Sequence, residues 1–469
     1  MSNISNTANI IDTPLSVRGN PTTRALREGL YAGIISLGLF VLFVGLESTQ
    51  NIRNELVLQE RWWLLAIFVI VAAVGRFLSV AYVRPWMAAH KAAAATQTGE
   101  ETEESFLKRN FSKIAIVALL FYPALAVALF GVQGSLKWVD NFGIQILIYV
   151  MLAWGLNIVV GLAGLLDLGY VAFYAVGAYS YALLSQQFGF SFWVLLPLAG
   201  ILAAFWGMIL GFPVLRLKGD YLAIVTLAFG EIIRLVLINW TEVTRGTFGV
   251  SGIPKASIFG IWSFDVGAPN NFAKAFGLPM SSAYYKIFLF YLILALCLLT
   301  AYITIRLRRM PIGRAWEALR EDEIACRSLG INTVTTKLTA FAIGAMFGGF
   351  AGSFFAVRQG FVSPESFVFL ESAIILAIVV LGGMGSLVGI AIAAAVMIGG
   401  TELLRELQFL KQIFGPDFTP ELYRMLIFGL AMIIVMVWKP RGFVGSREPT
   451  AFLKERKTVS GSFTKEGHG

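Results

Sequence analysis

Long apolar stretches alternate with short polar ones along most of the chain. A helix needs about 20 mostly apolar residues to cross the hydrocarbon core of a bilayer. The pattern therefore predicts an all-α polytopic membrane protein. The stretches long enough to span are 30–46, 62–82, 114–131, 142–162, 165–185, 192–212, 221–239, 284–305, 338–357 and 423–438.

One further apolar stretch, 372–400, is too long for a single crossing and is interrupted by a Gly-Gly-Met-Gly sequence at 382–385. Lys and Arg gather on the cytoplasmic side of membrane helices. This rule puts the arginine-rich segment 306–320 and the basic tail from Lys439 on that side, so an even number of crossings lies between them. We predict that 372–400 forms two arms, as a hairpin or a re-entrant pair. The core then has about ten membrane segments, after an N-terminal pair.

The same rule places both termini in the cytoplasm. The linker between the N-terminal pair and the core is alanine-rich, then acidic, and lacks hydrophobic periodicity. The predicted parts are a cytoplasmic N-terminal tail (1–29), a transmembrane pair (30–82), a cytoplasmic linker (83–113), a core (114–445) that includes a cytoplasmic segment at 306–337, and a cytoplasmic C-terminal tail (446–469).

Composition supports a membrane protein and excludes several other classes. The chain is 57% hydrophobic and 14% charged, whereas soluble proteins are about 25% charged. The net charge of +9 does not indicate nucleic-acid binding, because Lys and Arg lie beside the apolar spans as orientation signals do. The positions of Cys297, Cys326, His90 and His468 suit neither a disulfide framework nor a metal site nor a catalytic centre. No phosphate-binding Gly-Lys-Ser or Gly-Lys-Thr occurs, so any ATP that drives transport must bind to another subunit. No metal-ligand cluster or nucleophile motif occurs either, and we predict no enzymatic activity, cofactor or metal.

A few polar residues within the predicted spans are candidates for a solute path. Glu231 and Arg234 lie three positions apart, where they can share a helix face and offset each other's charge. They either face a path or form a self-satisfied pair against a neighbouring helix. Asp167 and Asn157 are further candidates. The alternatives are a helix-capping or interfacial role for Asp167 and an interhelical hydrogen bond for Asn157.

Small residues recur at helical spacing in two spans. They allow close helix packing, which we favour over a sliding or path-lining role. We interpret an aromatic series at helical spacing in the same way. The residues are Gly344, Gly348 and Gly352; Ala203, Gly207 and Gly211; and the aromatic Tyr170, Phe173 and Tyr174.

The cytoplasmic segment from Arg308 to Asn332 carries the most information. Pro311 suits the first position of a helix, and Gly330 can end a second one. Small apolar residues with intervening charges predict short amphipathic helices along the inner membrane surface. The segment either anchors the chain at that surface or docks a cytoplasmic partner.

Four stretches make the chain similar to a known family. They are Gly155–Leu184, Arg216–Asn239, Gly313–Asn332 and Val379–Ala394, and with their spacing they cover most of 114–445. The sequence resembles the permease subunits of bacterial branched-chain amino-acid ABC importers, in particular the larger of their two paired permeases. The resemblance implies an ABC importer permease bundle, in which 306–337 is the coupling loop that docks on an ATPase subunit.

ABC permeases often carry an EAA…G pattern in that loop. The nearest match here is Ile324-Ala325-Cys326 with Gly330, which lacks the leading glutamate. The residues that the resemblance assigns to coupling are Gly313, Glu317, Ala318, Glu323, Ala325, Cys326 and Gly330.

The resemblance also implies a function. The chain would move leucine, isoleucine or valine inward across the inner membrane of a bacterium by alternating access. Its partners would be a second, shorter permease, two cytoplasmic ATPase subunits, a periplasmic solute-binding protein and the lipid bilayer. The polar groups of the path would be Asn157, Asp167, Glu231 and Arg234.

Three alternatives stay open. A urea or short-chain amide ABC permease would have a similar sequence. An ion-coupled secondary amino-acid transporter usually carries coupling carboxylates at mid-membrane, where Glu231 is paired with Arg234. A membrane scaffold would explain the small-residue packing but not the resemblance of the coupling loop.

Overall fold

The chain divides into two compact units, Met1–Arg109 and Asn110–Gly469. The predicted tail 446–469 and most of the predicted linker 83–113 lie outside the described residues. The computed structural model of the chain describes residues 21–50, 56–83, 85, 106–214, 217, 219–265, 267, 269–406, 424–439 and 442–444.

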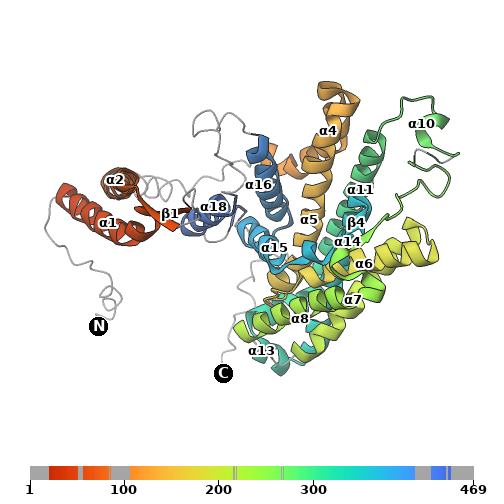
Figure 1. The fold of residues 1–469 in the computed structure, drawn as a ribbon. Helices are drawn as coiled ribbons and strands as arrows, with labels where there is room; N and C mark the ends of the chain where they lie inside the picture. The colour runs from red at the N-terminus through yellow and green to blue at the C-terminus, as the bar shows by residue number, and fades with distance from the viewer. Residues whose placement is uncertain are drawn as a thin grey trace, which may run out of the picture. The chain divides into compact units, whose positions relative to one another are not determined.

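The smaller unit consists of two helices joined by a pair of strands (Figure 1). Helix α1 packs along α2, and an ion pair of 2.8 Å joins Arg76 to Glu28. The antiparallel strand pair is an addition to the helices predicted here. Helix α1 begins inside the predicted tail 1–29, because proline suits the first turn of a helix. The elements are α1 (Pro21–Phe43), β1 (Leu46–Gln50), β2 (Leu56–Glu60), α2 (Trp62–Leu78) and the π-helix η1 (Ser79–Val83).

The larger unit is an almost entirely helical bundle. Its first elements are α4 (Phe106–Lys137), η2 (Trp138–Ile144), α5 (Gln145–Leu156), η3 (Asn157–Leu162), α6 (Val171–Phe188), α7 (Phe192–Val214), α8 (Asp220–Asn239), α9 (Thr241–Thr244), η4 (Gly246–Phe248) and β3 (Val250–Ser251). The remaining elements are α10 (Phe272–Ala275), α11 (Ala283–Arg309), α12 (Pro311–Glu321), α13 (Glu323–Ser328), α14 (Thr333–Gln359), β4 (Phe361–Val362), η5 (Pro364–Phe367), α15 (Phe369–Gly382), α16 (Leu387–Glu406) and α18 (Arg424–Trp438).

Helix α14 forms the centre of this bundle and packs against α5, α6 and α7. A Cβ on Gly344 would lie 2.9 Å from the carbonyl oxygen of Gly155, and a Cβ on Gly352 would overlap the backbone of Tyr174. The helices therefore touch backbone to backbone, and the packing interpretation of the small-residue face is confirmed. The aromatic series of α6 is also buried, and the hydroxyl of Tyr170 donates to the carbonyl oxygen of Gly344 at 2.8 Å.

Seven helices of the described residues are long and apolar enough to cross a membrane. One of them, Ile114–Leu162, covers the two predicted spans 114–131 and 142–162, and its backbone is not helical at Gly131, where the first of these spans ends. Helix α6 begins at Val171 and not at the predicted residue 165. The reason is a contact between distant parts of the chain: Gly169 lies against the backbone of Thr226, too close for a side chain, and the residues before Val171 form an irregular turn.

The predicted break in 372–400 is confirmed. Helix α15 ends at Gly382 and α16 begins at Leu387, with positive φ at Gly383 and Gly385. The amide of Gly385 donates to Asn157 Oδ1 at 2.8 Å, and Arg308 at the end of α11 donates to the carbonyl oxygen of Gly385 at 3.3 Å. The turn therefore reaches the level at which α11 ends, which favours a hairpin over a shallow re-entrant pair.

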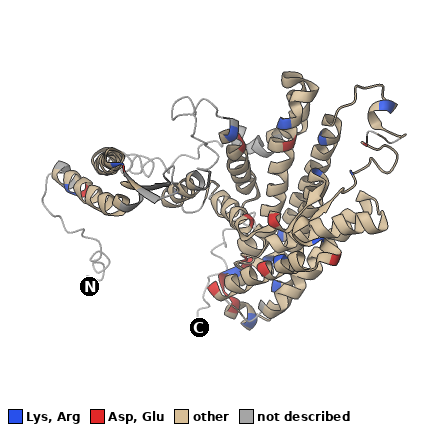
Figure 2. Cartoon of the chain, in the orientation of Figure 1, with Lys and Arg blue, Asp and Glu red and all other residues tan. Residues whose placement is uncertain are grey.

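The connections of the larger unit gather at two ends. The α10 end comprises 186–193, 250–286 and 358–371, where β3 pairs with β4. The α12 end comprises 161–169 and 308–337, together with the glycine turn. Figure 1 shows α10 and α13 far apart at opposite extremes of the unit. Figure 2 shows that charged residues are sparse along the helices and gather near α13.

Candidate functional site

The segment between α11 and α14 folds as two short helices, as predicted. Pro311 occupies the first turn of α12 after the extended Met310. Asp322 ends α12 and caps α13, because its carboxylate accepts the amides of Ile324 at 2.7 Å and Ala325 at 3.1 Å. Asn332 caps α14 in the same way. These caps set the residues at which α13 and α14 begin.

Side chains attach this segment firmly to the bundle. The buried indole of Trp316 donates to the carbonyl oxygen of Thr336 at 3.1 Å. Lys337 of α14 pairs with Glu323 at 3.0 Å, and Arg320 donates to the carbonyl oxygen of Gly161 at the end of η3. The two short helices therefore form a rigid extension of α14 and η3.

The seven residues assigned to coupling divide into two groups. Gly313 and Cys326 are buried, and Gly313 lies too close to the backbone of Leu307 for any side chain. Burial, reinforced by the carboxylates of Asp322 and Glu323, raises the pKa of the Cys326 thiol. Gly313 and Cys326 belong to a group that faces the bundle, together with Glu317 and Glu323, which form ion pairs, and the half-buried Ala318. The second group faces outward and consists of the exposed Ala325 and Gly330.

Sequence reasoning missed two exposed apolar residues here. Ile324 and Leu329 bracket the outward face of α13, and both are mostly exposed. Together with Ala325 and Gly330 they form an apolar face that projects from the bundle. The signal available in the sequence was the pair of large apolar residues in a short, otherwise charged segment.

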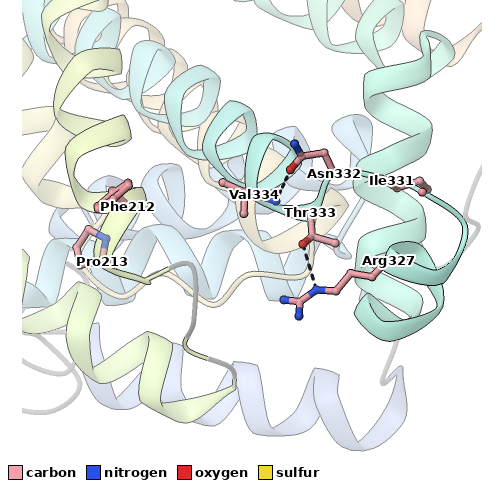
Figure 3. A pocket seen from close by; sticks show the side chains of 8 residues that line it. Phe212, Pro213, Arg327, Ile331, Asn332, Thr333 and Val334 are labelled. Atoms are coloured by element: carbon pink, nitrogen blue, oxygen red, sulfur yellow. Dashed lines mark hydrogen bonds between the residues drawn. The ribbon is translucent and has the colours of Figure 1, made fainter.

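An open cavity of about 980 Å³ lies beside this face. Figure 3 shows Phe212 and Pro213 of α7 on one side of it, and the connection from α13 to α14 on the other. Arg327 Nε donates to Thr333 Oγ1 at 3.3 Å across that connection. Gly330, with φ +81, lines the cavity and would be strained by any other residue.

Two of the candidates for a solute path are buried inside the bundle. Asn157 accepts the amide of Gly385, while its Nδ2 has no partner among the described residues. Asp167 accepts the amide of Gly169 at 2.9 Å, and its second oxygen has no partner within the described part of the chain. Both lie at the α12 end. The bond of Asn157 joins its helix to the turn between α15 and α16, as the interhelical alternative predicted. Asp167 does not cap α6, whose first turn has no side-chain cap, and its bond to Gly169 belongs to the irregular turn before that helix.

The other two candidates lie together on α8, with a third residue that the sequence did not suggest. Arg234 Nη2 lies 2.6 Å from Glu231 Oε1, and Arg234 Nη1 lies 3.8 Å from Glu365 Oε1 of η5. We call Glu231, Arg234 and Glu365 the exposed cluster. The exposed fractions of these side chains are 41%, 21% and 64%.

A second charged group lies at the α10 end and was also missed. Asp140 Oδ1 accepts Arg358 Nε at 2.7 Å and Lys286 Nζ at 3.2 Å. Arg358 also donates to Asn141 at 3.2 Å and Gln145 at 3.3 Å. We call Asp140, Lys286 and Arg358 the buried cluster, since the Arg358 side chain is only 8% exposed.

No part of the described chain brings together three or more His, Cys, Asp or Glu residues that could hold a metal. The arrangement therefore consists of a capped segment attached to the bundle, the exposed cluster on α8 and η5, and the buried cluster that joins η2, α11 and α14. None of these has the nucleophile and base geometry of a catalytic centre.

Comparison with known proteins shows which protein family the sequence matches. A family described as "Branched-chain amino acid transport system / permease component" matches residues 138–436, and a domain of unknown function matches 24–155. No solved structure matches the chain.

Individual relatives agree with that match. The "High-affinity branched-chain amino acid transport system permease protein LivM" of Salmonella typhimurium is 49% identical over 345 residues, which are 73% of this chain and 77% of the relative. LivM of Escherichia coli is 52% identical over 311 residues, 66% of this chain and 70% of the relative. The corresponding LivH of Salmonella typhimurium is 26% identical over 309 residues, 64% of this chain and 92% of the relative.

Proposed function

The chain belongs to the family of branched-chain amino acid transport permeases, and we propose that it is the larger permease subunit of an ABC importer for leucine, isoleucine and valine. Transport is inward and follows an alternating-access cycle. The chain is a multi-pass membrane protein and not an enzyme. We propose that the chain lies in the inner membrane of a bacterium, with both termini in the cytoplasm.

The observation that carries the proposal is the rigid segment between α11 and α14. When the ATPase subunits close on ATP, their motion can reach the transport path only through a segment of the permease that contacts them and is attached to the membrane helices. Helices α12 and α13 are attached to α14 through Trp316 and Lys337, and their outward face is apolar. The coupling residues therefore have two roles. Gly313, Glu317, Ala318, Glu323 and Cys326 hold the segment, while Ala325 and Gly330, with Ile324 and Leu329, meet the ATPase.

Partners follow from the family. The similarity to both LivM and LivH supports a second permease subunit that pairs with this one. Two ATPase subunits supply the hydrolysis, since the chain has no phosphate-binding Gly-Lys motif. A periplasmic solute-binding protein delivers the amino acid at the α10 end. The path runs past Asn157, Asp167, Glu231 and Arg234.

The proposed parts keep the predicted boundaries. They are a cytoplasmic tail (1–29), a transmembrane pair (30–82), a linker (83–113), the permease core (114–445) with its coupling loop (306–337), and a second tail (446–469). The core alone contains the coupling face and both charged clusters.

The docking face is tested with Ala325→Arg. A long charged side chain on this exposed apolar face should reduce co-purification of the ATPase subunits and labelled-leucine uptake by at least about 10-fold, because burying an unpaired charge costs several kcal/mol. The matched control is Ala275→Arg, on exposed α10 at the opposite end, which should co-purify normally.

A labelling experiment gives an independent readout. Cysteine placed by Ile324→Cys should react rapidly with a thiol reagent in the isolated permease and slowly in the full complex. Native Cys326 should react slowly in both, because it is buried and its thiol pKa is raised. Equal reactivity of the Ile324→Cys variant with and without ATPase, or normal co-purification of Ala325→Arg, contradicts the proposed docking.

A further inference from the structure

Helix α11 ends in three arginines, and only one of them is bound to the rest of the bundle. Arg308 donates to Glu317 of α12 and to the carbonyl oxygen of Gly385. Arg306 and Arg309 are exposed instead, and neither pairs with a carboxylate among the described residues. Two full positive charges in the last turn of this helix therefore have no counter-charge from the described part of the chain.

The depth of these arginines follows from the length of the uncharged part of α11. Residues 287–305 carry no charge and lie between Lys286 and Arg306. At about 1.5 Å per residue this part is roughly 30 Å long, which is about the thickness of the hydrocarbon core of a bilayer. Lys286 is fixed at the α10 end by its ion pair with Asp140 at 3.2 Å. Arg306 therefore lies where the hydrocarbon ends and the phosphates of lipid headgroups begin.

The exposed side of α11 changes from apolar to basic along its length. Leu299, Tyr302 and Ile305 have exposed fractions of 50%, 56% and 43%. We call these three residues the apolar stripe. Spacings of three, four and seven residues place Arg306 and Arg309 on the same side of the helix. The apolar stripe suits lipid acyl chains, and it leads directly to the two arginines.

Arg306 is held in an orientation that suits a headgroup. Its Nε donates to the hydroxyl of Tyr302 at 3.0 Å, and tyrosine is typical of the membrane–water interface. The two terminal amino groups of the guanidinium have no acceptor within the chain as described. They can therefore donate two parallel hydrogen bonds to one phosphate.

A third exposed arginine lies at the start of the next helix. Gly313 of α12 packs against the backbone of Leu307, too close for any side chain, so the first turn of α12 lies beside the last turn of α11. Arg314 follows Gly313, is exposed, and forms no ion pair in the described ranges. We call Arg306, Arg309 and Arg314 the arginine face. Its three charges lie at one end of a membrane span.

We infer that the arginine face binds the phosphate of an anionic phospholipid, whose acyl chains lie along the apolar stripe. Each basic residue near a membrane surface strengthens its attraction to anionic lipid. A zwitterionic headgroup is bound less well, because its own ammonium group lies beside the phosphate. Membrane anchoring and partner docking, which the sequence offered as alternatives for this segment, then belong to different side chains. The arginine face holds the lipid, and the outward face around Ala325 remains for the ATPase.

The test uses the complete transporter complex, purified in a neutral detergent. Its melting temperature is measured while phosphatidylglycerol, phosphatidylcholine or soluble glycerol phosphate is added. Phosphatidylglycerol should raise the melting temperature with increasing concentration, because a ligand that binds the folded state stabilises it. Phosphatidylcholine should raise it less. Glycerol phosphate, which has the phosphate but no acyl chains, should have no effect at the same concentrations.

Charge-removing variants locate the response. Arg306→Gln with Arg309→Gln should keep the melting temperature in detergent alone, since neither arginine has an ion pair to lose. This double variant should need at least about 10-fold more phosphatidylglycerol for the same stabilisation. Arg314→Gln should need at least about 3-fold more. The matched control is Arg245→Gln with Lys274→Gln, which removes two exposed charges before η4 and on α10 and should respond as the unmodified complex does.

Three results overturn the lipid site. They are an unchanged response of the double variant to phosphatidylglycerol, an equal response of the unmodified complex to phosphatidylcholine, and stabilisation by glycerol phosphate alone. Loss of the ATPase subunits from the double variant, with its lipid response unchanged, would assign these arginines to a protein contact instead. If the double variant does not assemble, Arg306→Lys with Arg309→Lys keeps the charge and should retain most of the response. None of these outcomes depends on which solute is transported, so the proposed function is tested separately.

Discussion

Two charged clusters of the larger unit contain the same kinds of side chain and differ in their surroundings. The buried cluster joins η2, α11 and α14 through a single carboxylate oxygen, Asp140 Oδ1. The exposed cluster joins only α8 and η5, and one of its two pairs is 3.8 Å long. In the first, each charge is committed to a neighbour. In the second, a carboxylate is left available.

The comparison shows that burial determines how readily the charges of an ion pair can exchange partners. A buried charge that loses its partner is stranded in a medium that cannot solvate it, so the pair is effectively permanent. An exposed pair exchanges its partner at little cost. We therefore expect the buried cluster to determine whether the bundle holds together, and the exposed cluster to determine what passes through it.

The largest effect is expected for Arg358→Ala. The change leaves Asp140 without its shortest ion pair, and breaking a buried pair costs about 3–5 kcal/mol. A thermal unfolding measurement on the purified complex should show a large decrease in melting temperature. Arg309→Ala, an exposed arginine at the far end of α11, is the matched control and should leave the melting temperature nearly unchanged.

An intermediate effect is expected for Arg358→Lys. The charge is kept, but the second set of bonds, to Asn141 and Gln145, is lost. Leaving buried polar groups unpaired costs about 1–3 kcal/mol. The same unfolding measurement should place this variant between Arg358→Ala and the unmodified protein. A melting temperature as low as that of Arg358→Ala would show that geometry, and not charge, holds the cluster.

The smallest effect on stability is expected for Arg234→Ala. An exposed pair contributes about 0–1 kcal/mol, so the melting temperature should change little. Leucine uptake should nevertheless fall at least about 5-fold, because Arg234 is one of the polar groups of the proposed path. A loss of stability equal to that of Arg358→Ala would erase the distinction between the clusters.

Local features of this fold were predictable from sequence. The glycine face of α14 and the break between α15 and α16 depend on spacing that is visible along the chain, because helix packing and helix termination both follow from glycine. The helices of the coupling segment were predictable for the same reason, from Pro311 and Gly330. The start of α6 was not, because the contact that delays it is made by Thr226, far along the chain.

The charged clusters show where sequence reasoning stopped. Glu231 and Arg234 were found since they lie in one span. Glu365 and Arg234 are separated by more than a hundred positions, and Asp140 and Arg358 by 218. The residues that flank each charge in the sequence do not indicate its partner. Helix packing brings the two side chains together, and it leaves no periodic pattern in the sequence. Arg358 follows directly after the predicted span 338–357, where a basic residue is usually an orientation signal. Its ion pair with Asp140 was therefore not predicted.

The guanidinium of Arg308 has a mechanical consequence. It contacts Glu317 of α12 at 3.3 Å and the carbonyl oxygen of Gly385 at 3.3 Å. One side chain thus joins α12 to the turn between α15 and α16. In the proposed transport cycle, a displacement of α12 by the ATPase would therefore reach the turn between α15 and α16 through Arg308 as well as through the contacts with α14.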